Sequence, residues 1–172
     1  MSLERKATDI VLKPGEYYVG DASCRIRTLL GSCVSISLWH PVKHVGGLSH
    51  FLLANRGSAA PGELDARYGE EVILLMLRDL KRWNVNASEC QGKIFGGGNM
   101  FPDQISAGMS NVGKHNGETA RRLLRDHGIA IISESLFGVG HRQIIFDVST
   151  GHVWVRQNEL TSTHHKETGK IA

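Results

Sequence analysis

The part of the chain that most constrains its fold is residues 28–53, TLLGSCVSISLWHPVKHVGGLSHFLL. From Val34 to Leu38 apolar residues alternate with serines, which is the period of a half-buried β-strand. A second apolar run, residues 44–53, follows a proline. In the tetrapeptide 40–43, HPVK, that proline stands at position i+1 of a type I turn. The stretch therefore predicts an antiparallel hairpin.

The predicted turn also sets which residues of the hairpin face each other. If residues 40–43 form the loop, Trp39 lies opposite His44, and the same register places Cys33 directly opposite His50. Directly opposed residues share one face of the sheet, with Cβ atoms about 4.5–5.5 Å apart. A one-residue slip would put the two side chains on opposite faces. We therefore expect a thiol and an imidazole within hydrogen-bonding reach of each other.

The remaining pattern predicts an α/β protein of the α+β type, with helices packed on a mixed β-sheet. The clearest helix covers residues 68–83, in which one face carries Val72, Leu75, Met76, Leu80 and Trp83. A second helix is expected at residues 116–127, with Asn116 as its N-cap and Gly128 just after its end. Further strands are expected at residues 24–30, 93–95, 129–135, 142–148 and 151–156.

Length and composition are those of one globular domain. The chain has 172 residues, of which 41% are hydrophobic and 22% charged. It shows neither a repeat nor a long linker, so we expect a single domain over residues 1–172. Its core is expected at about residues 10–156, followed by a flexible tail at 157–172. The net charge of +3 is small and mixed with acids, so no nucleic-acid partner is expected.

The chain also lacks the signals of membrane insertion and export. No segment reaches the ~18 apolar residues that a membrane helix needs, and the N-terminus has no apolar stretch typical of a secretory signal. The three cysteines, Cys24, Cys33 and Cys90, do not have the spacing of a disulfide framework. We expect a cytoplasmic protein that is not inserted in a membrane.

Cys33 and His50 are the two residue types that a cysteine-dependent catalyst needs. Only a thiolate attacks, and an ordinary cysteine has a pKa near 8.5. A neighbouring histidine can take the thiol proton and later give a proton to a leaving amine. The backbone amides of the Gly31-Ser32 step are expected to bind the oxyanion of a tetrahedral intermediate. Thr28 is the candidate for the residue that orients His50, and Ser49 is an alternative, although a strand neighbour points to the opposite face.

Three other interpretations remain open at this point. An unpaired cysteine in a strand is often a small core residue, and a histidine in an apolar strand is often buried for packing. A metal site would draw on Cys24, Cys33, His40, His44 and His50, although their spacing matches no known metal-binding motif. A papain-like peptidase would need a histidine and an asparagine 130–150 residues downstream in a strand context, which this chain lacks.

Four motifs, in order, resemble the CheD family of chemoreceptor glutamine deamidases. The first is LGSC, followed by a strand, a His-Pro turn and a Gly-x-x-His strand. The others resemble the family's Lys-x-Phe-Gly-Gly-Gly run, its Ile-Gly-x-x-Asn before a helix, and its C-terminal Gly-Gly-x-x-Arg strand pair. In this chain they are KIFGGGNMF at 93–101, VGKHN at 112–116 and GVGHRQIIFDVSTGHVWV at 138–155. The similarity covers roughly residues 10–156.

The resemblance implies a three-layer sandwich similar to the catalytic domain of the cytotoxic necrotizing factor toxins. It also implies a Cys-His-Thr deamidase that needs neither a cofactor nor a metal. Cys33 matches the nucleophile and His50 the base. In some family members the threonine lies six residues before the cysteine, where this chain has Arg27, whereas Thr28 lies five before. The resemblance further places Gly97 and Gly98 at the lining of the site.

The implied reaction converts specific glutamines of chemoreceptors to glutamate through a thioester, as part of bacterial chemotaxis adaptation. The implied partners are the cytoplasmic domain of methyl-accepting chemotaxis receptors and, in some bacteria, a CheC-type phosphatase that binds and inhibits the deamidase. The alternative is a non-enzymatic chemotaxis adaptor that binds receptors or such a phosphatase. An adaptor would not need the thiol of Cys33.

Overall fold

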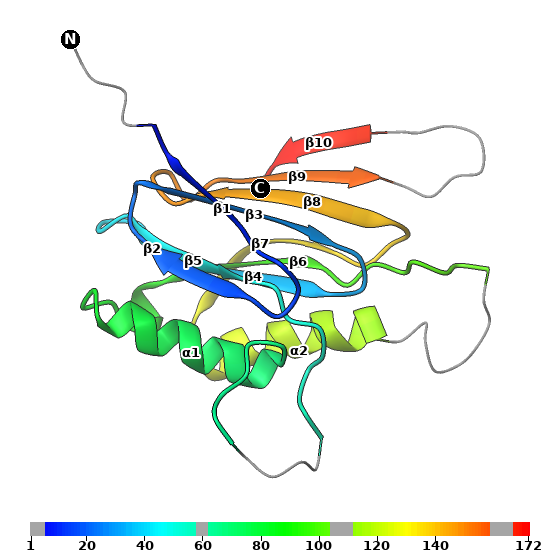
Figure 1. Cartoon of the computed structure of the whole chain (residues 1–172), viewed down its shortest axis with the longest axis horizontal. Coiled ribbons are helices and arrows are strands. Elements are labelled where there is room, and N and C mark those ends of the chain that lie inside the picture. The colour runs from blue at the N-terminus through cyan, green and yellow to red at the C-terminus, as the bar shows by residue number, and fades with distance from the viewer. Residues whose placement is uncertain (1–5, 58–61, 104–111, 159–166) are drawn as a thin grey trace.

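The computed structural model describes residues 6–57, 62–103, 112–158 and 167–172. These residues form three layers: two five-stranded sheets face each other, and two helices cover the outer side of the second sheet (Figure 1). Sheet A has the strand order β1 (Thr8–Val11), β3 (Cys24–Leu30), β8 (His141–Asp147), β9 (Val153–Asn158) and β10 (Glu167–Ile171). Sheet B has the order β2 (Tyr17–Gly20), β5 (Val45–Ser49), β4 (Val34–His40), β6 (Gln91–Gly96) and β7 (Ala130–Leu136). The α+β prediction is confirmed, whereas the likeness to the toxin domain stays a prediction.

Both sheets are mixed, because each combines antiparallel pairs with one parallel pair. The parallel pairs are β1–β3 in sheet A and β6–β7 in sheet B. Sheet B is buried on both faces: Val34, Ile36 and Leu38 of β4 point into the core beneath the helices. Leu48 and Phe95 point into the core between the two sheets. This second core is where the candidate site residues meet.

Helix α1 (Gly69–Lys81) and helix α2 (Val112–Asp126) form the third layer, and the short 3₁₀ turn η1 (Ala87–Glu89) precedes β6. The apolar face predicted for α1 is buried, except for Trp83, which is 42% exposed. The helix ends at Lys81, so Trp83 lies beyond it, and Asn84, the next residue, takes a left-handed conformation with φ 56°. Neither helix in the described part of the chain is long and apolar enough to span a membrane.

Helix α2 begins earlier than its sequence suggests. Asn116 is not the N-cap, because the helix already runs from Val112, and the asparagine lies inside it and is 1% exposed. Gly128 does follow the end of the helix, with the positive φ of 69° that favours glycine there. The polar side chain that marked a helix start is instead buried against the loops of the site.

The β4–β5 hairpin forms, but its register differs from the prediction by two residues. His40 pairs with Val45 and Trp39 with Gly46, so Trp39 is not opposite His44. The reason lies in His40, which stays in the strand while its Nδ1 accepts hydrogen bonds from the first amides of the loop. The loop therefore covers residues 41–44, and His44 adopts a positive φ of 53°.

The C-terminal residues differ from the flexible tail expected at 157–172. Strand β9 continues to Asn158, and β10 pairs antiparallel with it. Residues 159–166 lie outside the described ranges. The buried Lys93 donates from Nζ to the oxygen of Ala172 at 2.6 Å, and Ala172 packs against the core between the sheets. Strand β10 is therefore held by its main-chain pairing with β9 and by the bond from Lys93 to Ala172, although its sequence shows no strand period.

Candidate active site

Cys33 is the last residue of the short loop that joins β3 to β4. Its side chain is half-buried and packs against the core between the two sheets. Its carbonyl oxygen accepts a hydrogen bond from the backbone amide of Gly97 at 2.9 Å. Gly96 has a φ of 107°, and a Cβ there would lie 2.2 Å from the same oxygen. Only glycine fits at this position, and the close approach lets the segment after β6 bond the backbone of the cysteine loop.

His50 follows the end of β5 and is 2% exposed. Its backbone pairs with the turn before β2: its amide donates to Glu16 at 2.9 Å, and its carbonyl accepts from Gly15 at 2.8 Å. Its ring reaches across to sheet A, where Nδ1 lies 2.6 Å from the hydroxyl oxygen of Thr28 in β3. The structure thus brings Thr28 and His50 into contact.

The hydrogen bonds of Thr28 determine the tautomer of His50. The threonine hydroxyl donates its single hydrogen to the carbonyl oxygen of Leu12 at 2.9 Å. It can therefore only accept from the histidine, so Nδ1 of His50 carries the hydrogen and donates. Nε2 is left as the unprotonated nitrogen, and it bonds no residue in the described ranges. This is the tautomer that a general base requires.

The two-residue change of register keeps the cysteine and the histidine on one face. Side chains alternate with period two along a strand, so a shift by two preserves the face. With Val34 bridged to Phe51, Cys33 lies diagonally across from His50 instead of directly opposite. Ser49 is not bonded to His50, because its hydroxyl bonds the backbone of Ile36 instead. The prediction of direct opposition was wrong, but both side chains face the core between the sheets.

Burial sets the protonation states of the pair. Desolvation lowers the pKa of His50 to about 4, although the nearby Glu16 carboxylate acts in the opposite direction. Desolvation also raises the pKa of the Cys33 thiol above its ordinary value. Both shifts favour the neutral forms. At neutral pH the site therefore holds a thiol and a neutral imidazole instead of a preformed ion pair.

The predicted oxyanion donors, Gly31 and Ser32, and the predicted lining residues, Gly97 and Gly98, differ in whether their backbone amides are already bonded. The amides of Gly97 and Gly98 are occupied, because they donate to the carbonyl oxygens of Cys33 and Gly31, each at 2.9 Å. They support the loop but are not free donors. The backbone amides of Ser32 and Cys33 donate to none of the residues that the structure describes. These are the donors available next to the thiol.

Two buried polar residues that sequence reasoning did not assign to the site support it. Arg142 in β8 is 2% exposed and donates to the carbonyl oxygen of Gly96, the first residue of the glycine-rich segment, and to that of Phe137, which follows β7. Asn116 donates to carbonyl oxygens next to the cysteine and histidine segments. Both residues lie in motifs quoted above, Asn116 in 112–116 and Arg142 in 138–155, and this was the signal that could have pointed to them. A motif does not show which atoms a side chain contacts.

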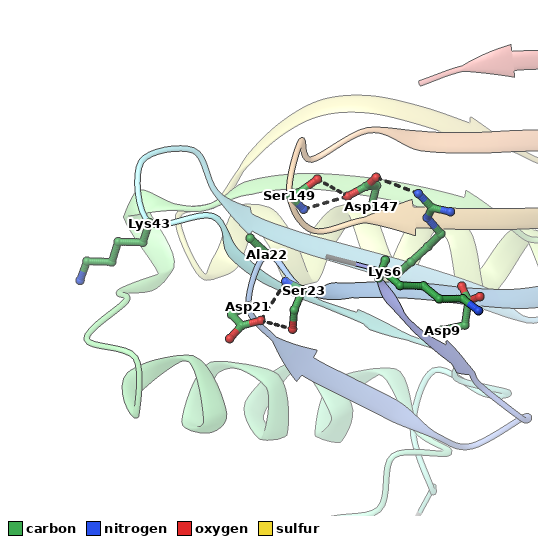
Figure 2. Close-up of a pocket in the computed structure, with 10 residues that line it drawn as sticks. Lys6, Asp9, Asp21, Ala22, Ser23, Lys43, Asp147 and Ser149 are labelled. Carbon is green, nitrogen blue, oxygen red and sulfur yellow. Dashed lines mark hydrogen bonds and ion pairs between the residues drawn. The ribbon is translucent and has the colours of Figure 1, made fainter. Parts of the chain in front are cut away.

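A pocket of about 910 Å³ lies at the other end of the molecule, at the start of β3 and the end of β8 (Figure 2). Two of its charged side chains form an ion pair: Arg25 lies 3.5 Å from Asp147, which also accepts from Ser149. Figure 2 shows Lys43 pointing away from the other side chains. Cys33 follows the opposite end of β3, a strand roughly 20 Å long. This pocket is therefore separate from the candidate site.

The residues considered for a metal site are not brought together. Cys24 begins β3, whereas Cys33 follows its other end. The ring of His40 bonds the hairpin loop, and that of His44 bonds the carbonyl oxygen of Ser149. Across the described ranges, no group of three or more His, Cys, Asp or Glu side chains is arranged to hold a metal ion.

Comparison with known proteins gives consistent matches along the chain. A family model described as CheD chemotactic sensory transduction matches residues 52–157. A protein of Albidiferax ferrireducens named "Probable chemoreceptor glutamine deamidase CheD 2" is 60% identical over 172 residues, covering 99% of both chains. The chain belongs to the CheD family. A Chromobacterium violaceum protein named "Probable chemoreceptor glutamine deamidase CheD 1" is 39% identical over 94% of this chain and 85% of its own length.

The relatives and the family model cover different parts of this CheD-family chain. The family model begins at residue 52, after Thr28, Cys33 and His50. The match with the Albidiferax protein extends over 99% of the chain and therefore includes all three residues. The family membership thus applies to the whole domain, including the loop that carries the thiol.

Proposed function

We propose that this CheD-family chain is a protein-glutamine deamidase that converts glutamines of chemoreceptors to glutamate, with Cys33 as nucleophile and His50 as base. The observation that carries the proposal is the 2.6 Å contact between Thr28 and Nδ1 of His50, which leaves Nε2 as a proton acceptor on the face of the sheet that Cys33 shares. The names of the relatives support the substrate class.

The first half of the reaction releases ammonia. Nε2 of His50 takes the thiol proton as the sulfur of Cys33 attacks the side-chain carbonyl carbon of the glutamine. The oxyanion that forms is bound by the amides of Ser32 and Cys33. The imidazolium then gives its proton to the amide nitrogen, the carbon–nitrogen bond breaks, and ammonia leaves a thioester behind.

The second half hydrolyses that thioester. His50 takes a proton from water as the water oxygen attacks the thioester carbon. The carbon–sulfur bond then breaks, the sulfur regains its proton from the imidazolium, and a glutamate side chain is released. Each turnover consumes one water, produces one ammonia and adds one negative charge to the receptor helix.

Burial shapes how the base works. Because His50 is neutral before substrate arrives, it is ready to accept a proton, but its imidazolium form is costly in a buried place. The Thr28 oxygen that accepts from Nδ1 and the Glu16 carboxylate nearby both stabilise the transient cation. The protonated histidine is thus a strong acid, which suits the release of ammonia.

The test is incubation of the purified chain with the cytoplasmic fragment of a methyl-accepting receptor, followed by mass spectrometry of glutamine-to-glutamate conversion, +1 Da per site. The native chain is expected to convert specific glutamines, Cys33→Ala to convert none, and Cys90→Ala, a buried cysteine outside the site, to retain activity. Absence of conversion by the native chain, or equal conversion by Cys33→Ala, contradicts the proposal and favours the adaptor.

A CheC-type phosphatase is the second proposed partner, and it is supported by family membership alone. If such a phosphatase binds over the site, adding it to the deamidation assay is expected to lower the rate in proportion to the complex formed. Binding without inhibition would place its contact elsewhere on the surface.

A further inference from the structure

The two strands of the β4–β5 hairpin separate where the site begins. Val34 and Phe51 form the last paired position, with backbone bonds of 3.1 and 3.0 Å. The next residues, Cys33 and Leu52, bond to other segments of the chain instead of to each other. The result is a fork, with Cys33 on one branch and Leu52, two residues after His50, on the other.

The side-chain amide of Asn116 closes this fork. Its Nδ2 donates to the carbonyl oxygen of Ser32 at 3.3 Å and to that of Leu52 at 2.8 Å. Both hydrogens of the amide are used, so its orientation is fixed: the flipped amide would set an oxygen against two carbonyl oxygens. The asparagine is 1% exposed, and its Oδ1 is buried with no partner among the described residues.

Two glycines let α2 come close enough to place this amide. A Cβ on Gly113 would lie 2.6 Å from the oxygen of Gly97, and one on Gly117 would lie 2.5 Å from the ring of Phe137. Gly113, Asn116 and Gly117 share one face of the helix, because residues three and four apart are neighbours. The helix therefore docks through its glycines and inserts Asn116 into the fork.

We propose that Asn116 is a positioning residue that fixes the separation of Cys33 and His50. Ser32 directly precedes the cysteine, and Leu52 lies two residues beyond the histidine, so one rigid amide ties both branches together. The catalytic consequence rests on the proposed function, since a misplacement of about 1 Å between reacting groups can cost a hundredfold in rate.

The experiment compares Asn116→Ala, which removes both hydrogen bonds, with Asn116→Ser, which keeps one donor. The matched control is Thr119→Val, a buried position one turn further along α2. Two quantities are measured on folded protein: kcat and KM for receptor deamidation, and the rate at which iodoacetamide alkylates Cys33 across pH, from peptide mass spectrometry. The alkylation assay needs no substrate, so it remains informative even if receptor deamidation fails.

The expected result is a fall of kcat by at least about tenfold in Asn116→Ala with KM within about twofold, a smaller fall in Asn116→Ser, and no change in Thr119→Val. The pH profile of Cys33 alkylation is expected to shift in both asparagine variants and not in the control. The proposal is overturned by native kcat and alkylation in Asn116→Ala. It is also overturned if activity falls only in proportion to the unfolded fraction while folded protein reacts normally.

Discussion

The hydroxyl of Thr28 accepts from Nδ1 of His50 at 2.6 Å and donates to Leu12 at 2.9 Å, so it joins the two sheets across their shared core. This single group sets both the direction and the tautomer of the histidine. It lies in β3, five residues before Cys33. The contact in space supports the proposal that Thr28 orients His50.

Replacing Thr28 by valine removes the hydroxyl and keeps the shape. We expect kcat/KM to fall about tenfold to 100-fold, part of the contribution that a general base makes. We also expect a loss of about 1–3 kcal/mol in the free energy of unfolding, because the buried Nδ1–H loses its acceptor. Thr28→Ser restores the hydroxyl and should recover most of the activity. Native rates in Thr28→Val would show that His50 is oriented by other contacts.

Stability is expected to depend on pH through His50. Its pKa is about 4 in the folded chain and near 6.5 when unfolded, so the folded state binds fewer protons between these values. The stabilisation is complete above pH 6.5 and is lost as pH falls toward 4, by at most about 3 kcal/mol. Urea unfolding at several pH values should show a steeper acid loss in the native chain than in His50→Gln. Parallel curves would mean that the histidine is not desolvated.

The reactivity of Cys33 should follow the raised pKa of its thiol. A preformed thiolate–imidazolium pair would react with iodoacetamide at pH 6, whereas a desolvated neutral thiol reacts slowly there. We expect alkylation of Cys33 to rise only as pH passes the ordinary range of thiols, near 8.5. Deamidation itself should persist down to about pH 5, since the base stays unprotonated. Fast alkylation at pH 6 would contradict the neutral pair.

Gly96→Ala is expected to displace the backbone of the cysteine loop. The new Cβ would lie 2.2 Å from the carbonyl oxygen of Cys33, at a φ of 107°. Gly128→Ala is the matched control, because it has a positive φ of 69° and no atom within 4 Å. We expect Gly96→Ala to lose at least about 2 kcal/mol more stability than the control, together with activity. Thermal unfolding of both variants measures this, and equal losses would show that the contact with Cys33 is unimportant.

Lys93 tests the attachment of the C-terminal strand. Its buried Nζ donates to Gly151 at 2.9 Å and to Ala172 at 2.6 Å. We expect Lys93→Met to lower the free energy of unfolding by about 2 kcal/mol, because two carbonyl groups lose a charged donor. Deamidation should change little, since these contacts lie away from the Cys33 end of the sheets. Lys170→Met, at an exposed position in β10, is the control, and equal effects would contradict the role of Lys93.

The hairpin shows which part of the site the sequence can predict. Period-two alternation determines the face of a side chain, and this assigned Cys33 and His50 to one face. The exact register depended on His40, whose ring accepts the loop amides and keeps it within the strand. Because the error was an even number of residues, the inference of a shared face survived it. An odd error would have separated the pair.

The sequence by itself determined the features that carry a period: the strands of the β4–β5 hairpin, the apolar face of α1, and the side of the sheet on which the thiol and imidazole lie. Only the tertiary structure decided the contacts between segments far apart in the chain. Thr28 reaches His50 from the other sheet, Asn116 enters the fork from α2, and β10 pairs with β9. The local alternation of residues determines which way a side chain faces. Its contact partner depends on how the sheets and helices pack, because packing brings together segments that no repeating pattern in the sequence relates.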